Sequence, residues 1–186
     1  MIQDTPETRT LLDTALHVSR WVSQVASGCP YASVGDLLGA ADLAARSLSS
    51  AEIDEALASH PRIGAAGSGS SASLSRSEQA ASSTDDPALV AAMTAGNRAY
   101  EERFGRIFLI RAAGRSRPEI LAELNRRLAL APAEEEREVA DQLREIALLR
   151  LQALFVVSAL SAVPTTARPA VPSVPPPASS SDEERS

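Results

Sequence analysis

Apolar residues recur at helical spacing along most of the chain. In the first such stretch they lie three or four residues apart, at Leu11, Ala15, Val18, Val22 and Val25. A cap residue followed by a proline, Thr5-Pro6, precedes them, as is typical of a helix start. The pattern predicts one helix that begins near Pro6, contains His17 and ends at Gly28.

Helix start signals recur at three further positions: Ser33-x-x-Asp36, Ser49-x-x-Glu52 and Ser116-x-Pro118-Glu119. Each pairs a serine with an acidic residue three positions later, so that each side chain can accept a hydrogen bond from the other residue's backbone N–H. The helix that starts at Ser49 is expected to stop at His60-Pro61, because a residue before proline disfavours helical geometry.

Two longer helices are predicted in the second half of the chain. One opens at Asp86-Pro87 and ends at Gly105, and the other begins near Pro132 and runs to about Leu160. Between them, the apolar run from Ile107 to Ile110 could be a buried strand or a helical segment, and periodicity does not decide between the two.

Two stretches differ from the helical pattern in composition. Residues 64–77 are rich in glycine and serine and are expected to form a loop, whereas proline and serine dominate from residue 163 onward. Such a tail has too little apolar area to offset its ordering entropy. The sequence therefore predicts an all-α, single-domain, multi-helix bundle of about seven to nine helices over residues 1–162, with a disordered Pro/Ser-rich tail over residues 163–186.

Composition limits the classes of function. The net charge is −6 and no basic stripe is present, which argues against nucleic-acid binding. Cys29 is the single cysteine, so a disulfide within the chain is excluded, which fits a reducing cytoplasm. The longest apolar stretch, Leu151 to Val163, is too short and too polar to span a membrane. We expect a cytoplasmic protein that binds neither nucleic acid nor a membrane.

Arg150 is the least expected residue of the last predicted helix. At about 100° per residue, it falls in the middle of an apolar face that is formed by Val139, Leu143, Ile146, Ala147 and Leu154. An isolated buried charge is costly, so Arg150 needs a partner. It is half of a buried ion pair, a snorkelling side chain, or a clamp for a substrate carboxylate.

His60 and Glu78 are the candidates for proton transfer. His60 stands at a predicted helix end, and an imidazole titrates near neutral pH, although a histidine there could simply cap the helix. Ser75-x-x-Glu78 fits a helix capping box. The same carboxylate would also suit acid–base chemistry if the fold brought it to His60.

Six motifs follow one another in order: Trp21 in the first helix, His60-Pro61-x-x-Gly64, Ser75-x-x-Glu78-Gln79, Asn97-x-x-Tyr100, Phe104-Gly105-x-x-Phe108 and Ile146-x-x-x-Arg150-Leu151. Each is weak alone, but their order and spacing together are specific. Over residues 21–154 the chain resembles the family of 2-oxo-4-hydroxy-4-carboxy-5-ureidoimidazoline (OHCU) decarboxylases, which act between urate and allantoin.

The resemblance implies an all-helical homodimer that acts on a small ureide substrate without a metal or an organic cofactor. It implies that His60 is the catalytic histidine and that Glu78 is its acidic partner. The residues that it implies for substrate binding are Pro61, Ser75, Gln79, Arg150 and, through its backbone, the segment Arg106-Ile107-Phe108-Leu109-Ile110.

The implied reaction is decarboxylation of OHCU to (S)-allantoin, in which the substrate's own C=N bond accepts the electrons that CO₂ leaves behind. Two alternatives stay open: a related lyase or hydrolase that acts on another ureide or hydantoin, and a non-catalytic helical interaction module with the proline-rich tail as its docking segment. If His60, Glu78, Gln79 and Arg150 converge on one pocket, the enzyme is favoured.

Overall fold

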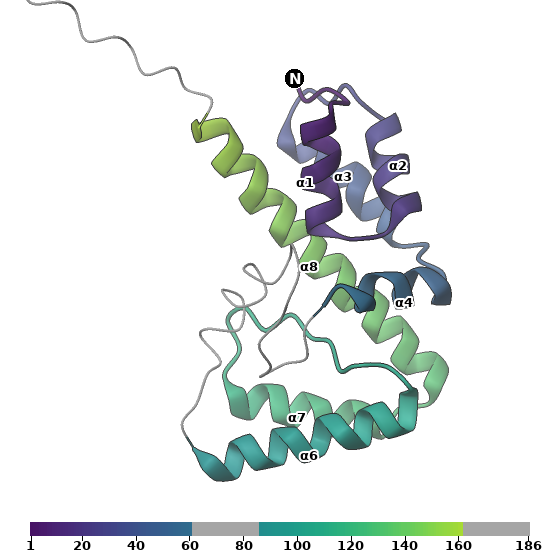
Figure 1. Ribbon diagram of the computed structural model, residues 1–186, viewed down its shortest axis with the longest axis vertical. Helices are drawn as coiled ribbons and strands as arrows, with labels where there is room; N and C mark the ends of the chain where they lie inside the picture. Colours follow the sequence, from purple (N-terminus) through teal and green to yellow (C-terminus); the bar gives the residue numbers. More distant parts are fainter. Residues whose placement is uncertain (61–85, 162–186) are drawn as a thin grey trace, which may run out of the picture.

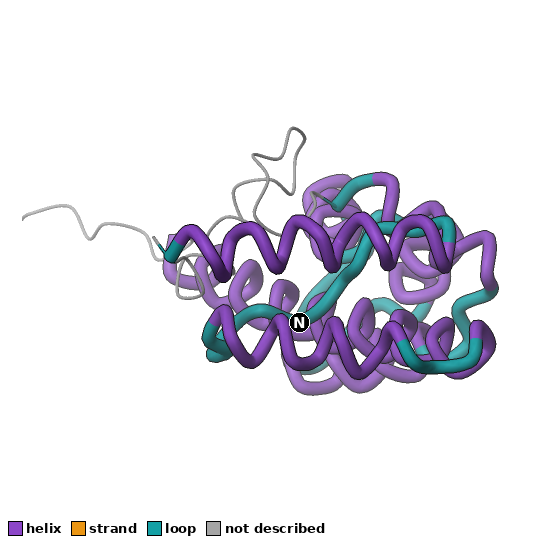
Figure 2. The backbone as a smooth tube through the Cα atoms, turned by 90° about the horizontal axis from the view of Figure 1, so that it is seen from below, coloured by secondary structure: helices purple, strands orange, loops and turns teal. Residues whose placement is uncertain are grey.

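The computed structural model describes residues 1–60 and 86–161, with side chains up to residue 157. Within these ranges the chain forms seven helices, and Figure 2 shows these ranges as helices joined by loops, with no strand. They are α1 (Pro6–Ala15), α2 (Ser19–Ser27), α3 (Val34–Ala45), α4 (Ser50–Ala58), α6 (Pro87–Phe104), α7 (Arg117–Leu128) and α8 (Pro132–Ser161). The predicted all-α class and number of helices are confirmed. The predicted tail, residues 163–186, lies outside the described residues.

The long helix α8 is the axis of the fold (Figure 1). Helices α1, α3 and α4 pack directly on it, and α2 packs on α1 and α3. Helices α6 and α7 pack against each other and lie below the N-terminal half of α8 in the view of Figure 1. No helix in the described ranges is long and apolar enough to cross a membrane.

The apolar core is divided into two clusters. The first joins α1 to α4 with α8, and the fully buried Trp21 lies within it. The indole N–H of Trp21 donates a hydrogen bond to the carbonyl oxygen of Ala41 at 3.0 Å, which satisfies its one polar atom. The second cluster joins α6 and α7 with the connection between them and includes Met93, Tyr100 and Leu124.

The prediction of one helix from Pro6 to Gly28 is wrong, because the chain is extended between α1 and α2. Leu16 and Val18 have extended backbone angles and are buried, whereas His17 between them is exposed. Successive side chains of an extended backbone point in opposite directions. The break therefore puts both apolar neighbours into the core and leaves His17 at the surface, where its Nδ1 lies 2.9 Å from Asp13.

The predicted helix starts at Ser33, Ser49 and Ser116 are confirmed, each with the reciprocal hydrogen bonds of a capping box. Gly105 ends α6 in the left-handed conformation, at φ 70°, which glycine adopts without strain. The last helix begins at Pro132 and ends at Ser161, as expected.

Glu52 links the start of α4 to α2, because its carboxylate accepts hydrogen bonds from Arg20 as well as from Ser49. The Arg20 guanidinium is the main cause that lowers the pKa of Glu52, to about 2 from an ordinary value of 4.5. A group with a lowered pKa in the folded state stabilises the fold above its unfolded pKa, and this contribution is lost as the pH falls through the folded pKa.

The substitution Glu52→Gln tests this linkage. We expect it to lower the free energy of unfolding above pH 5 by on the order of 1–3 kcal/mol. This difference in stability between wild type and variant should shrink as the pH falls from 4.5 to 2. Urea unfolding of both proteins at pH 6 and pH 2.5 measures the difference. Glu102→Gln, in an exposed pair with Arg98, is the control and should cost less than about 0.5 kcal/mol. A difference in the free energy of unfolding that stays the same at both pH values would contradict the lowered pKa of Glu52.

Candidate active site

His60 and Arg150 lie in contact, although they are 90 positions apart in the chain. His60 follows the C-terminal end of α4, and its Nδ1 is 2.9 Å from the carbonyl oxygen of Ala56 in the last turn of that helix. Its other ring nitrogen, Nε2, is 3.2 Å from Nη1 of Arg150 on α8. The end of α4 and the middle of α8 therefore build this contact together.

The partners of the two ring nitrogens define the tautomer of His60. A carbonyl oxygen only accepts hydrogen bonds and a guanidinium only donates them. In this arrangement Nδ1 therefore carries the proton and donates to Ala56, and the lone pair of Nε2 faces Arg150. A neutral imidazole held in this way is suited to accept a proton at Nε2.

Arg150 is 3% exposed and lies among the apolar residues of α8, as its position in the sequence pattern predicted. A guanidinium cannot lose its proton in a protein, so this site places a permanent positive charge in a poorly hydrated environment. Such a charge is a strong ligand for a carboxylate or a carbonyl oxygen.

Four predicted site residues cannot be placed relative to this contact: Pro61, Ser75, Glu78 and Gln79 lie outside the described residues. Of the four side chains whose convergence would favour an enzyme, the structure brings together His60 and Arg150.

The predicted substrate-binding segment, residues 106–110, is neither a helix nor part of a sheet. Its side chains alternate between the two core clusters. Ile107 and Leu109 pack with the first cluster, and Phe108 and Ile110 belong to the second. Because successive side chains of an extended chain point to opposite faces, this pattern indicates an extended segment buried on both sides. The choice left open by periodicity is thus resolved in favour of an extended, strand-like segment.

Arg106, at the start of this segment, directs its side chain away from the His60–Arg150 contact. Its Nε is 2.6 Å from Asp54 of α4 and its Nη1 is 3.0 Å from Glu136 of α8. The hydrogen bond with Asp54 is the main cause that raises the pKa of Arg106 above its ordinary value. Glu136 lies about 21 Å along α8 from Arg150, at 1.5 Å per residue. The side chain of Arg106 therefore belongs to a different part of the surface.

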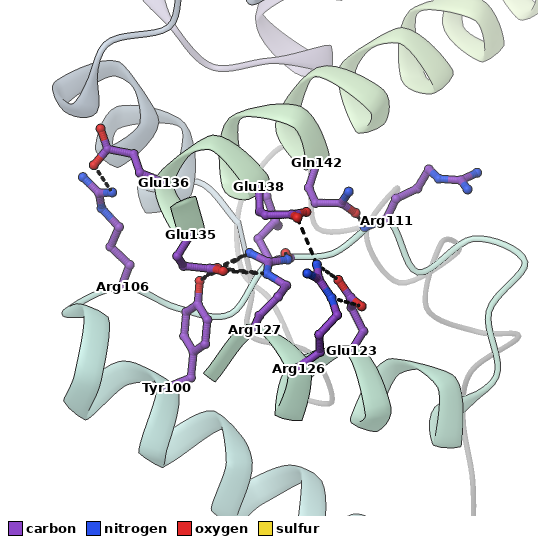
Figure 3. Close-up of polar contacts among 11 residues, drawn as sticks. Tyr100, Arg106, Arg111, Glu123, Arg126, Arg127, Glu135, Glu136, Glu138 and Gln142 are labelled. Carbon is purple, nitrogen blue, oxygen red and sulfur yellow. Dashed lines mark hydrogen bonds and ion pairs between the residues drawn. The ribbon is translucent and has the colours of Figure 1, made fainter. Parts of the chain in front are cut away.

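A buried ion pair stands beside the segment, between Arg127 of α7 and Glu135 of α8 (Figure 3). Nε of Arg127 lies 2.9 and 3.0 Å from the two oxygens of Glu135, and Tyr100 of α6 donates its hydroxyl hydrogen bond to the same carboxylate. Burial, followed by the contact with Glu135, raises the pKa of Tyr100, which keeps the phenol protonated as the donor.

Arg127 was not among the predicted site residues, although the sequence contains a signal for it. Ile120, Leu124 and Arg127 are spaced four and three residues apart on one face of α7, and all three are fully buried. This is the pattern of an arginine on an apolar face that singled out Arg150. Glu135 had no comparable signal, because it stands among the acidic residues of the first turn of α8.

A cleft of about 460 Å³ lies next to this ion pair, and Glu135 is one of the residues that line it. Tyr100, Phe104, Arg106 and Glu136 are among the residues that line it. Neither His60 nor Arg150 does, so this cleft is separate from the His60–Arg150 contact.

A match to a protein-family model shows the family to which the chain belongs. The model for OHCU decarboxylase matches residues 3–152, which is most of the sequence. The chain belongs to the OHCU decarboxylase family.

One solved structure of an OHCU decarboxylase agrees with this membership, and a second solved structure shares the fold. A crystal structure of OHCU decarboxylase in the presence of (S)-allantoin matches with a TM-score of 0.66 and 25% identity, over 77% of this chain and 96% of that one. A crystal structure of (S)-allantoin synthase shares the fold, with a TM-score of 0.56 and 19% identity, over 78% of this chain and 48% of that one. No curated protein sequence matches the chain at the stringency applied.

The tautomer of His60 in this family member can be measured directly. Nitrogen-15 NMR of the imidazole at pH 8 should show Nδ1 protonated and Nε2 unprotonated, because their partners are the Ala56 carbonyl and Arg150. Exposed His17 is the internal reference, and His60→Gln assigns the signals. An Nε2-protonated ring would contradict the arrangement.

Proposed function

We propose that this chain decarboxylates OHCU to (S)-allantoin and CO₂ in urate and purine catabolism. The observation that carries the proposal is the contact of 3.2 Å between Nε2 of His60 and Nη1 of the buried Arg150, in a chain of the OHCU decarboxylase family. A scaffold gains little from burying a guanidinium against an imidazole, whereas a substrate with a carboxylate and an exchangeable proton needs both groups.

The reaction needs no external electron acceptor. OHCU carries a hydroxyl group and a carboxylate on one ring carbon, next to a C=N bond. When the bond to CO₂ breaks, its electron pair forms a double bond between the two ring carbons, and the nitrogen of the former C=N bond takes up a proton, which leaves an enol. Loss of the enol hydroxyl proton and addition of a proton to the neighbouring carbon then give allantoin. The protein must orient the carboxylate, allow these protons to move and expose one face of the ring.

Arg150 is assigned to an acidic or carbonyl oxygen of the substrate. Its burial excludes competing water, which strengthens the interaction between the guanidinium and an anionic oxygen. The position next to His60 would bring the bound oxygen within reach of the imidazole.

His60 is assigned to proton transfer. The hydrogen bond from Nδ1 to Ala56 fixes the ring orientation and leaves the lone pair of Nε2 on the side of Arg150. Glu78 is proposed as the second proton-transfer group, with Pro61, Ser75 and Gln79 lining the pocket, and these assignments rest on the family resemblance. The backbone of residues 106–110 is proposed to bind the amide groups of the ureide.

The remaining features of the proposal also follow from the family. We expect a homodimer in the cytoplasm that acts without a metal or an organic cofactor. The contact between His60 and Arg150 counts against a non-catalytic interaction module, because such a module has no use for that pair. A lyase or hydrolase acting on another ureide would use the same groups, and substrate comparison separates it from the proposal.

Replacing His60 tests its assignment. His60→Ala should lower kcat about 10²–10⁴-fold, the usual contribution of a general acid or base, without loss of helical circular dichroism. The loss of OHCU absorbance, with OHCU generated fresh from urate, measures the rate above spontaneous decay. His17→Ala removes an exposed histidine and should leave kcat unchanged. Wild-type kcat in His60→Ala would refute a role in proton transfer.

Replacing Arg150 tests the oxygen clamp. Arg150→Met keeps an apolar side chain of similar length on the buried face of α8, so the fold should survive. The substrate should bind roughly 10–100-fold more weakly, since a hydrogen bond to a charged group contributes about 1.5–3 kcal/mol. Steady-state kinetics give KM and kcat, and Arg98→Met, at an exposed position, is the control. An unchanged KM and kcat in Arg150→Met would contradict the clamp.

A further inference from the structure

We infer that Arg127, supported by Glu135 and Tyr100, and Gln142 are positioning residues that hold the extended substrate-binding segment in register. The inference rests on the proposed function for the role of that segment. Arg127, Glu135 and Gln142 are not part of the motifs that carry the family resemblance. Tyr100 is part of one motif, but the resemblance assigns it no role.

The backbone of residues 107–112 is buried and lies outside any helix or sheet. Phe108, Leu109, Ile110 and Ala112 are each at most 5% exposed, so water does not solvate this stretch. In the described part of the chain no strand lies beside it. Buried backbone N–H and C=O groups that lack partners are costly, so other groups must supply the hydrogen bonds that a sheet would provide.

Two side chains form hydrogen bonds with the backbone on one edge of the segment. Nη1 of Arg127 donates to the carbonyl oxygen of Leu109 at 2.8 Å, and Oε1 of Gln142 accepts from the backbone N–H of Arg111 at 2.9 Å. In an extended chain, alternate residues direct their hydrogen-bonding groups to the same edge. Leu109 and Arg111 therefore share an edge, and α7 and α8 hold that edge at two consecutive points.

The opposite edge belongs to Phe108 and Ile110. Among the described residues, none of the hydrogen bonds found involves the backbone N–H or C=O groups of these two residues. This edge presents alternating donors and acceptors, which complement the N–H and C=O groups of a ureide in the way that a strand edge receives an extended peptide. Within residues 1–60 and 86–157, the stretch is thus bound on one edge and forms no backbone hydrogen bond through Phe108 or Ile110 on the other.

The segment also lies near the His60–Arg150 contact along α8. Arg111 forms an ion pair with Glu145 of α8 at 2.9 Å, and its backbone is bound by Gln142 of the same helix. Glu145 precedes Arg150 by about 7.5 Å, at 1.5 Å per residue. A ligand of the size of a ureidoimidazoline can span that separation.

Arginine is suited to this position because its planar guanidinium group has N–H donors that point in two directions. Nε and Nη2 of Arg127 bind Glu135, and Nη1 remains aimed at Leu109. Glu135 thereby fixes the plane of the guanidinium, and Tyr100 in turn fixes Glu135. The guanidinium carbon also lies 4.9 Å from the centre of the Phe108 ring. A lysine has a single ammonium group on a flexible chain, which lacks this planar arrangement of donors.

The main test removes the whole polar cluster. Removing Arg127 alone would leave Glu135 buried without its partner, so the variant is R127M/E135L/Y100F, because apolar replacement of a complete buried ion pair is often neutral for stability. We expect a folded protein with faster amide hydrogen exchange over residues 107–112. KM for OHCU should rise roughly 10–100-fold, with kcat within about threefold of wild type. Unchanged exchange and unchanged KM in the folded variant would overturn the inference.

A second pair of variants keeps the inference testable if the triple variant does not fold. Q142E retains an acceptor for the Arg111 N–H and should keep wild-type KM, whereas Q142L lacks it and should raise KM by about tenfold or more. Q152L, at an exposed position of the same helix, is the control. Equal effects of Q142E and Q142L would overturn the role of Gln142 in register.

Hydrogen exchange separates this inference from the proposed function. If wild-type protein does not turn over OHCU, the proposed function fails, but exchange over residues 107–112 in R127M/E135L/Y100F and Q142L still decides whether these side chains hold the segment. If wild type is active and both variants keep wild-type KM, the positioning role alone fails.

Discussion

The structure depends on one constraint: the apolar faces of several helices are buried against a single long helix, α8. Helices α1, α3 and α4 pack on it, and its apolar face completes the first core cluster. The same helix supplies the polar groups that the site requires. From its N-terminal end onward these are Glu135, which holds Arg127, then Gln142 and Glu145, which hold Arg111, and then Arg150, which contacts His60. One rigid element thus sets the spacing of the site.

Two buried arginines occupy similar positions on their helices but have different chemistry. Arg127 is 0% exposed, and its charge is matched by a carboxylate on the neighbouring helix. Arg150 is 3% exposed, and it contacts an imidazole nitrogen that carries no proton in this arrangement. Burial strengthens any interaction of a charge. The first arginine uses that strength on the fold, and the second is the one that we propose for substrate binding.

Local signals in the sequence predicted much of the fold, because they depend on neighbouring residues. The capping boxes at Ser33, Ser49 and Ser116 and the glycine at 105 mark helix ends where the structure has them. The break at His17 could not be predicted in the same way. Ala15, Val18 and Val22 keep helical spacing across it, and only tertiary packing decides that Leu16 and Val18 both enter the core.

The site was predictable to a more limited extent. Arg150 stood out because a charge on an apolar face requires a partner, and the same argument would have found Arg127. That His60 is the partner of Arg150 follows from the packing of α4 on α8, which no local pattern reveals. The extended form of residues 107–110 was also hidden, since a run that is apolar at every position does not show that successive side chains enter two different clusters.

The stereochemistry of the product is the measurement that decides whether this chain forms (S)-allantoin from OHCU at the His60–Arg150 contact, as we propose. OHCU generated from urate decays spontaneously to racemic allantoin, which has no circular dichroism. With wild-type protein present, we expect rapid appearance of the circular dichroism of (S)-allantoin, and with His60→Ala only the slow racemic decay. If well-folded wild-type protein leaves the product racemic, the proposed function is wrong.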